Sequence, residues 1–240
     1  MKMMSMIQGS QEWHKYRYKR IGGTSIKKIM GTSGASALLD DLTSAWLETY
    51  EHEEGFTSDA MQRGIDLEPM ARQDLSLSTG VKFEEVGVIQ SDIAILALSP
   101  DGISSCGSIA CEIKCPSRAV HMGYIRENKI PTEYFWQAMG YFAVNPRLKA
   151  LHFASYRPES MIPLWSIEIC RNDLVKFKKN QTVEAFAIAI RSVAVSLQEM
   201  VVDELNRLKD EYFLEFDKTQ AKFVEMVNEN KAKMLEVEAC

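Results

Sequence analysis

Hydrophobic and polar residues follow two different rhythms along the chain. Between residues 85 and 114, short apolar or β-branched runs are separated by Ser-Asp, Pro-Asp-Gly and Cys-Gly breaks, which favour turns. This pattern is typical of antiparallel strands joined by tight turns. It predicts strands over 85–90, 93–99 and 108–114.

Further elements flank this meander. Residues 66–78 and 132–144 are predicted to form helices, and residues 151–156 and 164–170 two more strands. The resulting order of helix, meander, helix, strands and helix indicates an α/β (α+β) fold, in which helices pack on a mixed central sheet.

The last part of the chain has a helical pattern. No glycine follows Gly140 and no proline follows Pro163, as long helices require. From Leu197 onward, apolar residues recur mostly at steps of three, four or seven, which gives a helix one narrow apolar stripe. We expect a domain over 1–196 and a helical extension over 197–240, whose stripe packs on the domain, on another subunit or on another protein.

The composition is that of a soluble globular protein, because 46% of the 240 residues are apolar and 25% are charged. The best apolar run, 93–98, suits a strand and is far shorter than the roughly 18 residues that cross a membrane. The N-terminal sequence lacks the apolar core of a signal peptide. We therefore expect a cytoplasmic protein with no membrane partner.

The net charge of −5, from 28 basic and 33 acidic residues, at first argues against nucleic acid as a partner. The charge is unevenly placed, however. Residues 198–240 hold 11 acidic and 6 basic residues and account for the whole excess, whereas residues 1–197 hold 22 of each. Residues 13–39, called the basic segment below, contain basic residues and no acidic ones.

A candidate reaction centre lies in the meander. Asp101 stands in a Pro-Asp-Gly turn, and Glu112 and Lys114 share one face of a later strand. If residues 101–112 fold back as a hairpin, two carboxylates and an ammonium share one pocket. Close carboxylates repel each other unless a hard cation such as Mg²⁺ lies between them, and a metal-bound water can attack a phosphodiester. Metal-assisted phosphodiester hydrolysis is the chemistry indicated.

Each part of this pattern also has an ordinary structural explanation. Pro-Asp-Gly is a common turn sequence, and a Glu-x-Lys pair on a strand is usually a solvated ion pair worth at most about 1 kcal/mol. The pattern by itself leaves both interpretations open.

Short blocks on both sides of the centre add information. In chain order they are Trp13-His14-Lys15-Tyr16-Arg17, Ile21-Gly22-Gly23-Thr24-Ser25, Arg63-Gly64-Ile65-Asp66-Leu67-Glu68, Leu98-Ser99-Pro100-Asp101-Gly102, Glu112-Ile113-Lys114-Cys115-Pro116 and Tyr134-Phe135-Trp136-Gln137. In order and spacing, these blocks resemble the lambda exonuclease and YqaJ-type family of viral recombination nucleases. This family is a branch of the PD-(D/E)xK superfamily, so the resemblance implies a restriction-endonuclease-like fold.

The resemblance implies a role for each residue of the centre. Asp101, Glu112 and the backbone carbonyl of Ile113 match metal ligands, and Lys114 matches the catalytic lysine. Glu68 matches a helical glutamate that helps to hold a second metal ion. Its alternative is an acid at a helix N-terminus, favoured there by the macrodipole.

Residues outside the centre match the family as well. Gln137 matches a glutamine that orients the lysine or the water, and is otherwise a polar residue of an amphipathic helix. Arg17 matches an arginine that binds the 5′-phosphate of a DNA end, which a guanidinium grips bidentately. Thr24 or Ser25 stands where the family has a hydroxyl residue near the scissile strand.

Three more residues are candidates for DNA binding. Trp13 either stacks on a base near the duplex end or belongs to the core. His14, which the family shares, anchors a phosphate or the local turn. Arg118 follows the Glu-x-Lys strand, at a spacing that differs slightly from that of the family.

For the whole protein, the resemblance implies a Mg²⁺-dependent 5′-to-3′ exonuclease that digests one strand of linear double-stranded DNA from a 5′-phosphorylated end. Two ions, for which Mn²⁺ can substitute, a homotrimer and a phage single-strand annealing recombinase are further implications, with a phage or prophage origin in a bacterial host. The acidic helices are predicted to lie away from these motifs and from DNA. The alternatives are another PD-(D/E)xK endonuclease and a non-catalytic recombination adaptor.

Overall fold

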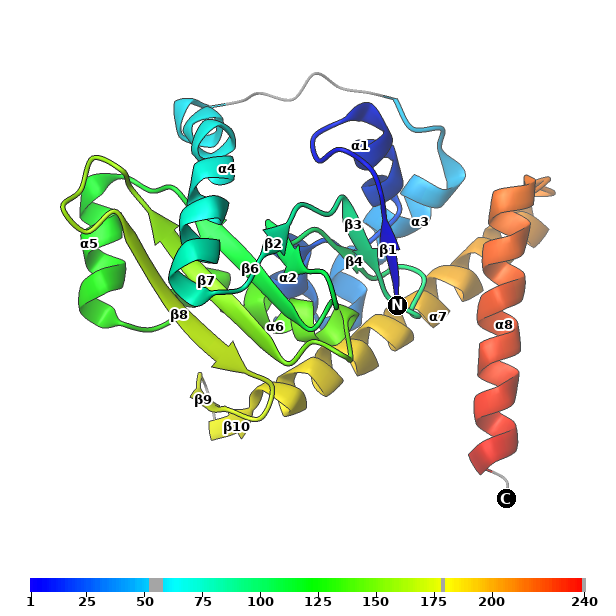
Figure 1. Cartoon of the computed structure of the whole chain (residues 1–240). Helices are drawn as coiled ribbons and strands as arrows, with labels where there is room; N and C mark the ends of the chain where they lie inside the picture. The colour runs from blue at the N-terminus through cyan, green and yellow to red at the C-terminus, as the bar shows by residue number, and fades with distance from the viewer. Residues whose placement is uncertain (52–57, 178–179, 239–240) are drawn as a thin grey trace.

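A five-stranded sheet forms the centre of the molecule, in a computed structural model that describes residues 1–51, 58–177 and 180–238 (Figure 1). Its strands, in spatial order, are β2 (Phe83–Glu84), β5 (Gly102–Ser104), β6 (Ile109–Lys114), β7 (Ala150–Tyr156) and β8 (Leu164–Cys170). All neighbours are antiparallel except β6 and β7. The predicted α/β fold with a mixed central sheet is thus confirmed.

The parallel pair β6–β7 needs a long crossover, which helices supply. The crossover contains α5 (Arg118–Glu127), the 3-10 turn η3 (Thr132–Tyr134) and α6 (Phe135–Val144). Residues 132–144 had been predicted as one helix, and they form η3 followed directly by α6. The crossover brings α6 back against β7 and the small sheet described next.

A second, three-stranded sheet is made of β1 (Lys2–Met4), β3 (Val88–Gln90) and β4 (Ala97–Leu98). The predicted meander is therefore divided, because its first two strands lie in this sheet and its last hairpin lies in the central sheet. Gly87 permits the close approach of the N-terminal segment, since a Cβ there would lie 2.3 Å from the carbonyl oxygen of Met6. A short antiparallel pair is formed by β9 (Leu174–Lys176) and β10 (Asn180–Thr182).

Short helices cover the N-terminal part of the molecule. They are α1 (Gln11–Tyr18), η1 (Gly23–Ser25), α2 (Ile26–Ile29), η2 (Gly34–Leu38) and α3 (Leu39–Leu47). The side chain of Ser10 caps α1 by accepting a hydrogen bond from the backbone N–H of Trp13. None of the residues of α1 is fully buried, so apolar burial contributes little to fixing this helix.

Helix α4 (Asp59–Thr79) begins earlier than the predicted 66–78. Its start is set by Ser58, whose side chain accepts from the N–H of Met61, and its end by Gly80 in the left-handed conformation. Ala71 and Leu75 of α4 pack on the face of the central sheet opposite α6.

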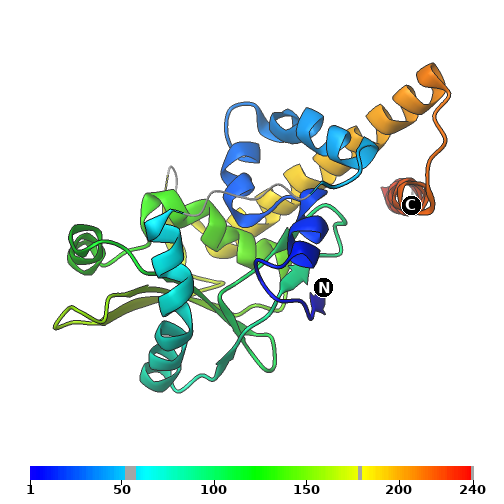
Figure 2. The ribbon, with the colours of Figure 1, turned by 90° about the horizontal axis from the view of Figure 1, so that it is seen from above.

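Helix α7 (Val183–Tyr212) crosses the molecule and packs against α6, α3 and α2 (Figure 2). By length and composition alone α7 is apolar enough to cross a membrane, but its buried residues belong to the main core. The expected boundary between 196 and 197 falls inside this helix, and Leu197, Val201 and Leu205 are buried. The apolar stripe thus continues the core of the domain.

Helix α8 (Lys218–Glu238) turns back from the end of α7 and lies apart from the central sheet (Figure 1). It contacts the domain through Phe223, whose ring stacks on Trp46 of α3 at a centroid distance of 4.0 Å. Of the three predicted partners for the stripe, the domain itself is therefore one.

Candidate active site

The β5–β6 hairpin places Asp101 beside Glu112, as the turn spacing predicted. The N–H of Asp101 donates to the carbonyl of Cys111 at 3.1 Å, and Asp101 Oδ2 accepts from the N–H of Ile113 at 2.6 Å. Gly102 allows this close pairing, because a Cβ there would lie 2.8 Å from the sulfur of Cys111. The turn and the next strand thus form one rigid unit.

Glu112 and Lys114 face the same side of the sheet and form an ion pair. The side chain of Glu112 is only 2% exposed and that of Lys114 is 25% exposed. A surface salt bridge would be far more solvated, so this ordinary explanation of the Glu-x-Lys pattern does not hold. Asp101, Glu112 and Lys114 are called the charged cluster below.

Helix α6 closes the charged cluster from one side. Gln137 Nε2 donates to Glu112 Oε1 at 2.7 Å, and the hydroxyl of Tyr141 donates to Glu112 Oε2. The Tyr141 hydroxyl also lies 3.2 Å from the carbonyl oxygen of Ser99. Gln137 had been predicted and Tyr141 had not. The spacing of four residues on one helix is the signal that places both side chains on the same face.

Helix α4 approaches the charged cluster from the other side. Glu68 forms an ion pair with Arg72, and Arg72 Nε donates to the backbone carbonyl of Asp101. Because α4 begins at Asp59, Glu68 lies well inside the helix, and its interpretation as a helix N-terminal acid is wrong. Arg72, which the sequence patterns did not single out, ties Glu68 to the Asp101 turn.

The charges of the cluster act on each other strongly. Burial, together with the nearby Glu112 carboxylate, raises the pKa of Asp101 well above its usual range. Burial alone would lower the pKa of Lys114, but the carboxylates of Glu112 and Asp101 outweigh it and raise that pKa. Lys114 is therefore a cation at neutral pH, and Asp101 is a carboxyl group that lacks sufficient positive charge around it.

This donor set suits a hard divalent cation. Asp101, Glu112 and the carbonyl of Ile113 offer oxygen ligands, which Mg²⁺ prefers, and the raised pKa of Asp101 indicates unmet demand for positive charge. Within 1–51, 58–177 and 180–238, no three Asp, Glu, His or Cys side chains converge as a complete metal site. Glu112 is held instead by Lys114, Gln137 and Tyr141, so it would exchange part of these contacts for a cation.

Arg17 of α1 lies near Tyr141, the residue that binds Glu112 of this cluster. Its guanidinium carbon is 4.0 Å from the centroid of the Trp13 ring, and a Cβ on Gly22 would lie 2.7 Å from its Nη2. Its Nε is buried and has no hydrogen-bond partner in the described part of the chain. Burial lowers the pKa of Arg17, and Tyr141 opposes that change. A guanidinium with an unpaired Nε is thus connected to the cluster through Tyr141.

The ring of Trp13 packs against the guanidinium of Arg17. The indole N–H donates to the carbonyl of Gly87 at 3.0 Å and to the hydroxyl of Ser99 at 2.9 Å. The ring is half-buried, and the guanidinium of Arg17 covers one of its faces. The N–H of Trp13 is thus anchored to the fold, and stacking of its ring on a DNA base stays a prediction.

The remaining predicted DNA-binding residues lie in η1, α1 and α5. Thr24 is exposed in η1 and Ser25 is half-buried beside it, directly after Gly23, which lies against Gln137. His14 is exposed and meets the ring of Trp13 edge-on. Arg118 is exposed at the start of α5, and none of the described hydrogen bonds joins it to the charged cluster.

The acidic C-terminal region approaches the basic segment at one place, in the link between its two helices, whereas its separation from DNA stays a prediction. Asp217, in the link between α7 and α8, is near enough to Lys19 to affect its pKa, which desolvation lowers and Asp217 tends to raise. Gln220 Nε2 donates to the carbonyl of Trp46 at 2.7 Å, and Lys19 lies over the ring of Trp46. The link is drawn to this place because Phe223 docks on Trp46.

The sequence matches the family model of the YqaJ-like viral recombinase domain over residues 12–147. The chain belongs to this family. The match includes the whole of the site, from Trp13 to Tyr141, and confirms the resemblance seen in the sequence blocks. A search among curated proteins found no match.

Solved structures share the fold of this YqaJ-like domain. An alkaline exonuclease, LHK-Exo, from Laribacter hongkongensis is 24% identical, with a TM-score of 0.69 over 85% of this chain and 98% of that chain. The same values hold for its complex with dAMP. A phage-related exonuclease from Haemophilus somnus 129PT is 14% identical, with a TM-score of 0.51 over 79% of this chain and 96% of that one.

Proposed function

We propose that this YqaJ-like protein is a Mg²⁺-dependent 5′-to-3′ exodeoxyribonuclease that degrades one strand of linear double-stranded DNA from a 5′-phosphorylated end. The observation that carries the proposal is the position of Arg17, whose guanidinium has an Nε unpaired among the described residues and lies near Tyr141, the partner of Glu112 in the charged cluster. Arg17 can donate to a terminal phosphate, and the charged cluster contains groups suited to phosphodiester hydrolysis. The solved exonucleases with this fold support the reaction class.

Asp101, Glu112 and the carbonyl of Ile113 would hold one ion, and Glu68 would help to hold a second. When bound, Mg²⁺ polarises the phosphate and lowers the pKa of a coordinated water, and Mn²⁺ can supply the same chemistry. Lys114, kept protonated by its carboxylate neighbours, donates to the negative charge that grows on the phosphate oxygens. Gln137 and Tyr141 hold the Glu112 carboxylate in place.

Arg17 selects the DNA end in this proposal. A terminal phosphate offers more free oxygen atoms to a planar guanidinium than an internal phosphodiester does, so bidentate binding favours the end. Trp13 restricts the guanidinium from one face and Gly22 leaves room at its edge. Further candidates for contacts to the phosphates of the DNA backbone are Thr24, Ser25, His14 and Arg118.

The biological setting belongs to the same proposal. The 3′ single-stranded tail would be handed to a phage single-strand annealing recombinase for homologous recombination, in the cytoplasm of a bacterial host. A homotrimer is the proposed assembly. We assign catalysis to residues 1–196 and assembly or partner binding to residues 197–240, although α7 joins the two parts continuously.

The test compares three substrates in Mg²⁺: a 5′-phosphorylated linear duplex, the same duplex with a 5′-hydroxyl, and a closed circle. We expect rapid degradation of the first, slow degradation of the second and no cutting of the third. Nicking of circles would instead support a PD-(D/E)xK endonuclease. A complete lack of cleavage in Mg²⁺ and Mn²⁺ would support a non-catalytic adaptor.

Lys114→Ala tests the assigned chemistry. Its cleavage rate is expected to fall on the order of 10²- to 10³-fold, while binding of the DNA end is retained, because Lys114 acts on the charge that develops during the reaction. Cleavage at the wild-type rate would show that the assigned mechanism is wrong.

A further inference from the structure

The side chain of Gln90, at the end of β3, joins helix α1 to the centre of the fold. Its Oε1 accepts one hydrogen bond from the hydroxyl of Tyr16 and another from Nε of Arg20, both at 2.8 Å. Tyr16 lies within α1, and Arg20 lies just beyond its end. Arg20 also stacks on the ring of Tyr16 and donates to the Tyr16 carbonyl, so the two residues form one unit.

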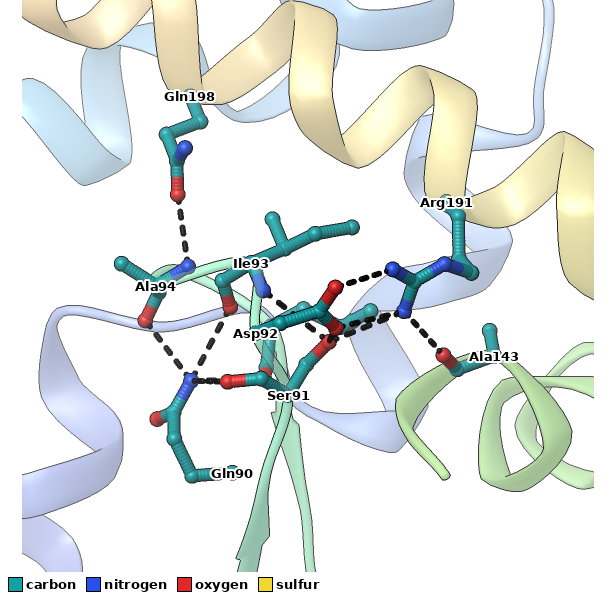
Figure 3. Close-up of polar contacts among 9 residues, drawn as sticks. Gln90, Ser91, Asp92, Ile93, Ala94, Ala143, Arg191 and Gln198 are labelled. Carbon is teal, nitrogen blue, oxygen red and sulfur yellow. Dashed lines mark hydrogen bonds and ion pairs between the residues drawn. The ribbon is translucent and has the colours of Figure 1, made fainter. Parts of the chain in front are cut away.

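The other end of the same amide holds the loop between β3 and β4 (Figure 3). Gln90 Nε2 lies 3.1 to 3.2 Å from backbone carbonyl oxygens of this loop, which are those of Ser91, Ile93, Ala94 and Leu96. The orientation of the amide is fixed, because only its nitrogen can donate to these carbonyls and only its oxygen can accept from Tyr16 and Arg20.

The loop is itself fixed from the opposite side by α7. Gln198 Oε1 accepts from the N–H of Ala94 at 2.7 Å, and Arg191 binds both carboxylate oxygens of Asp92 at 2.9 and 2.6 Å (Figure 3). Arg191 also donates to the carbonyl of Ala143 in α6. Gln90 therefore ties α1 to a loop that is braced against the two core helices.

The chain that follows α1 depends on the same loop. The N–H of Ile21 donates to the carbonyl of Ile95 at 2.6 Å, and the N–H of Ala97 donates to the carbonyl of Ile21 at 3.2 Å. Ile21 directly precedes Gly22, which lies against the guanidinium of Arg17. The loop thus holds Ile21 and the adjoining Gly22, which lies against Arg17, while Gln90 holds the helix that carries Arg17.

Helix α1 is held by polar contacts, because none of its residues is fully buried. Besides Tyr16, the indole N–H of Trp13 donates to the carbonyl of Gly87, and the hydroxyl of Tyr18 donates to Glu48 at 3.2 Å. Arg17 is next to Tyr16 in sequence, so a small rotation of α1 displaces its guanidinium. The contact of Tyr16 with Gln90 is therefore the attachment nearest in sequence to Arg17 on one side.

We propose that Gln90 is a positioning residue for DNA-end binding, which holds α1 so that Arg17 stays against Trp13 and Gly22, near Tyr141. The inference rests on the proposed function for its catalytic consequence. The restraint of α1 by the Gln90 amide does not depend on nuclease activity and can be tested without it.

Two variants test the restraint from its two ends. Gln90→Met removes both sets of hydrogen bonds at nearly constant volume, and Tyr16→Phe removes one bond from the α1 side without touching the loop. Asn145→Ala is the matched control, because Asn145 is a buried amide that bridges to the carbonyl of Gly107, away from α1.

Hydrogen exchange of the full chain is the first measurement. We expect faster amide exchange in residues 11–18 of Gln90→Met and, to a smaller extent, of Tyr16→Phe, with no such change in Asn145→Ala. This readout needs no DNA and no metal. Unchanged exchange over α1 in both variants overturns the inference, whether or not the protein proves to be a nuclease.

Kinetics on 5′-phosphorylated duplex are the second measurement. Gln90→Met is expected to raise KM on the order of tenfold with kcat within about twofold, because a binding group is misplaced while the charged cluster is intact. A lower melting temperature with KM unchanged would reduce Gln90 to a structural role. Absence of cleavage by the wild-type protein counts against the proposed function alone, since hydrogen exchange still decides the restraint.

Discussion

The guanidinium carbon of Arg17 lies over the indole ring of Trp13, 4.0 Å from its centroid, and the indole N–H is in turn bonded to Gly87 and Ser99. Ser99 also supplies a carbonyl oxygen to the hydroxyl of Tyr141, which binds Glu112. One short chain of contacts therefore links the proposed phosphate-binding residue to a proposed metal ligand. The residues proposed for end recognition and for cleavage thus share a single scaffold.

Replacement of Arg17 by lysine is expected to remove end selection without removing positive charge. A lysine ammonium cannot form the two parallel hydrogen bonds that a guanidinium makes with a phosphate. We expect kcat/KM for the 5′-phosphorylated duplex to fall on the order of tenfold or more, and that for the 5′-hydroxyl duplex to change little.

Lys15→Ala is the control for Arg17→Lys, because Lys15 is an exposed cation of the same helix. It is expected to preserve the ratio of kcat/KM between the two duplexes. An unchanged ratio in Arg17→Lys would exclude Arg17 as the residue that reads the terminal phosphate.

Tyr141→Phe is expected to slow cleavage although Tyr141 is not a predicted ligand. The variant removes one hydrogen bond to Glu112 Oε2 and leaves the ring packing in place. Loss of a partner that orients a metal ligand typically costs about 10- to 100-fold in activity or metal affinity, and we expect an effect of that size.

The matched control for this variant is Tyr124→Phe, which removes a tyrosine hydroxyl bonded to Glu133. It is expected to retain wild-type activity. If raising the Mg²⁺ concentration restores part of the Tyr141→Phe activity, the hydroxyl acts through metal affinity. Full activity at limiting Mg²⁺ would contradict this role of Tyr141.

The sequence predicted best those elements whose apolar pattern matches their burial. Strand β7 is buried along its whole length, and its bounds differ from the predicted 151–156 by one residue. The Asp101–Glu112 hairpin was equally predictable, because the Pro-Asp-Gly turn and the strand alternation determine which side chains meet. Helix α1 had no such signal, since it is polar and none of its residues is fully buried.

The residues that sequence reasoning missed act through contacts between distant segments. Arg72 meets the Asp101 carbonyl, 29 positions away, and Gln90 meets Tyr16, 74 positions away. A single arginine or glutamine in a sequence carries no sign of such a partner. The approach of Asp217 to Lys19 could not be predicted for the same reason, since it accompanies the stacking of Phe223 on Trp46.

The pKa of Asp101 links the site to stability. Because burial and Glu112 raise this pKa in the folded state, the folded protein binds more protons than the unfolded chain between the unfolded and the folded pKa. Folding stability contributed by Asp101 therefore falls as pH rises through that window. Above the window, the metal-free protein carries the full destabilising effect of the buried carboxylate.

Asp101→Asn is accordingly expected to stabilise the metal-free protein above this pH window while abolishing cleavage. Asparagine keeps an acceptor for the N–H of Ile113 and removes the charge, so we expect the melting temperature in EDTA to rise on the order of 2–4 °C. Mg²⁺ should then raise the melting temperature of the wild-type protein and leave that of Asp101→Asn nearly unchanged, because the substitution removes one of the two carboxylates proposed to hold the ion. Thermal denaturation of both proteins, with and without Mg²⁺ and across pH, measures these changes in melting temperature. Equal Mg²⁺ stabilisation of the two proteins would show that Asp101 is not a ligand.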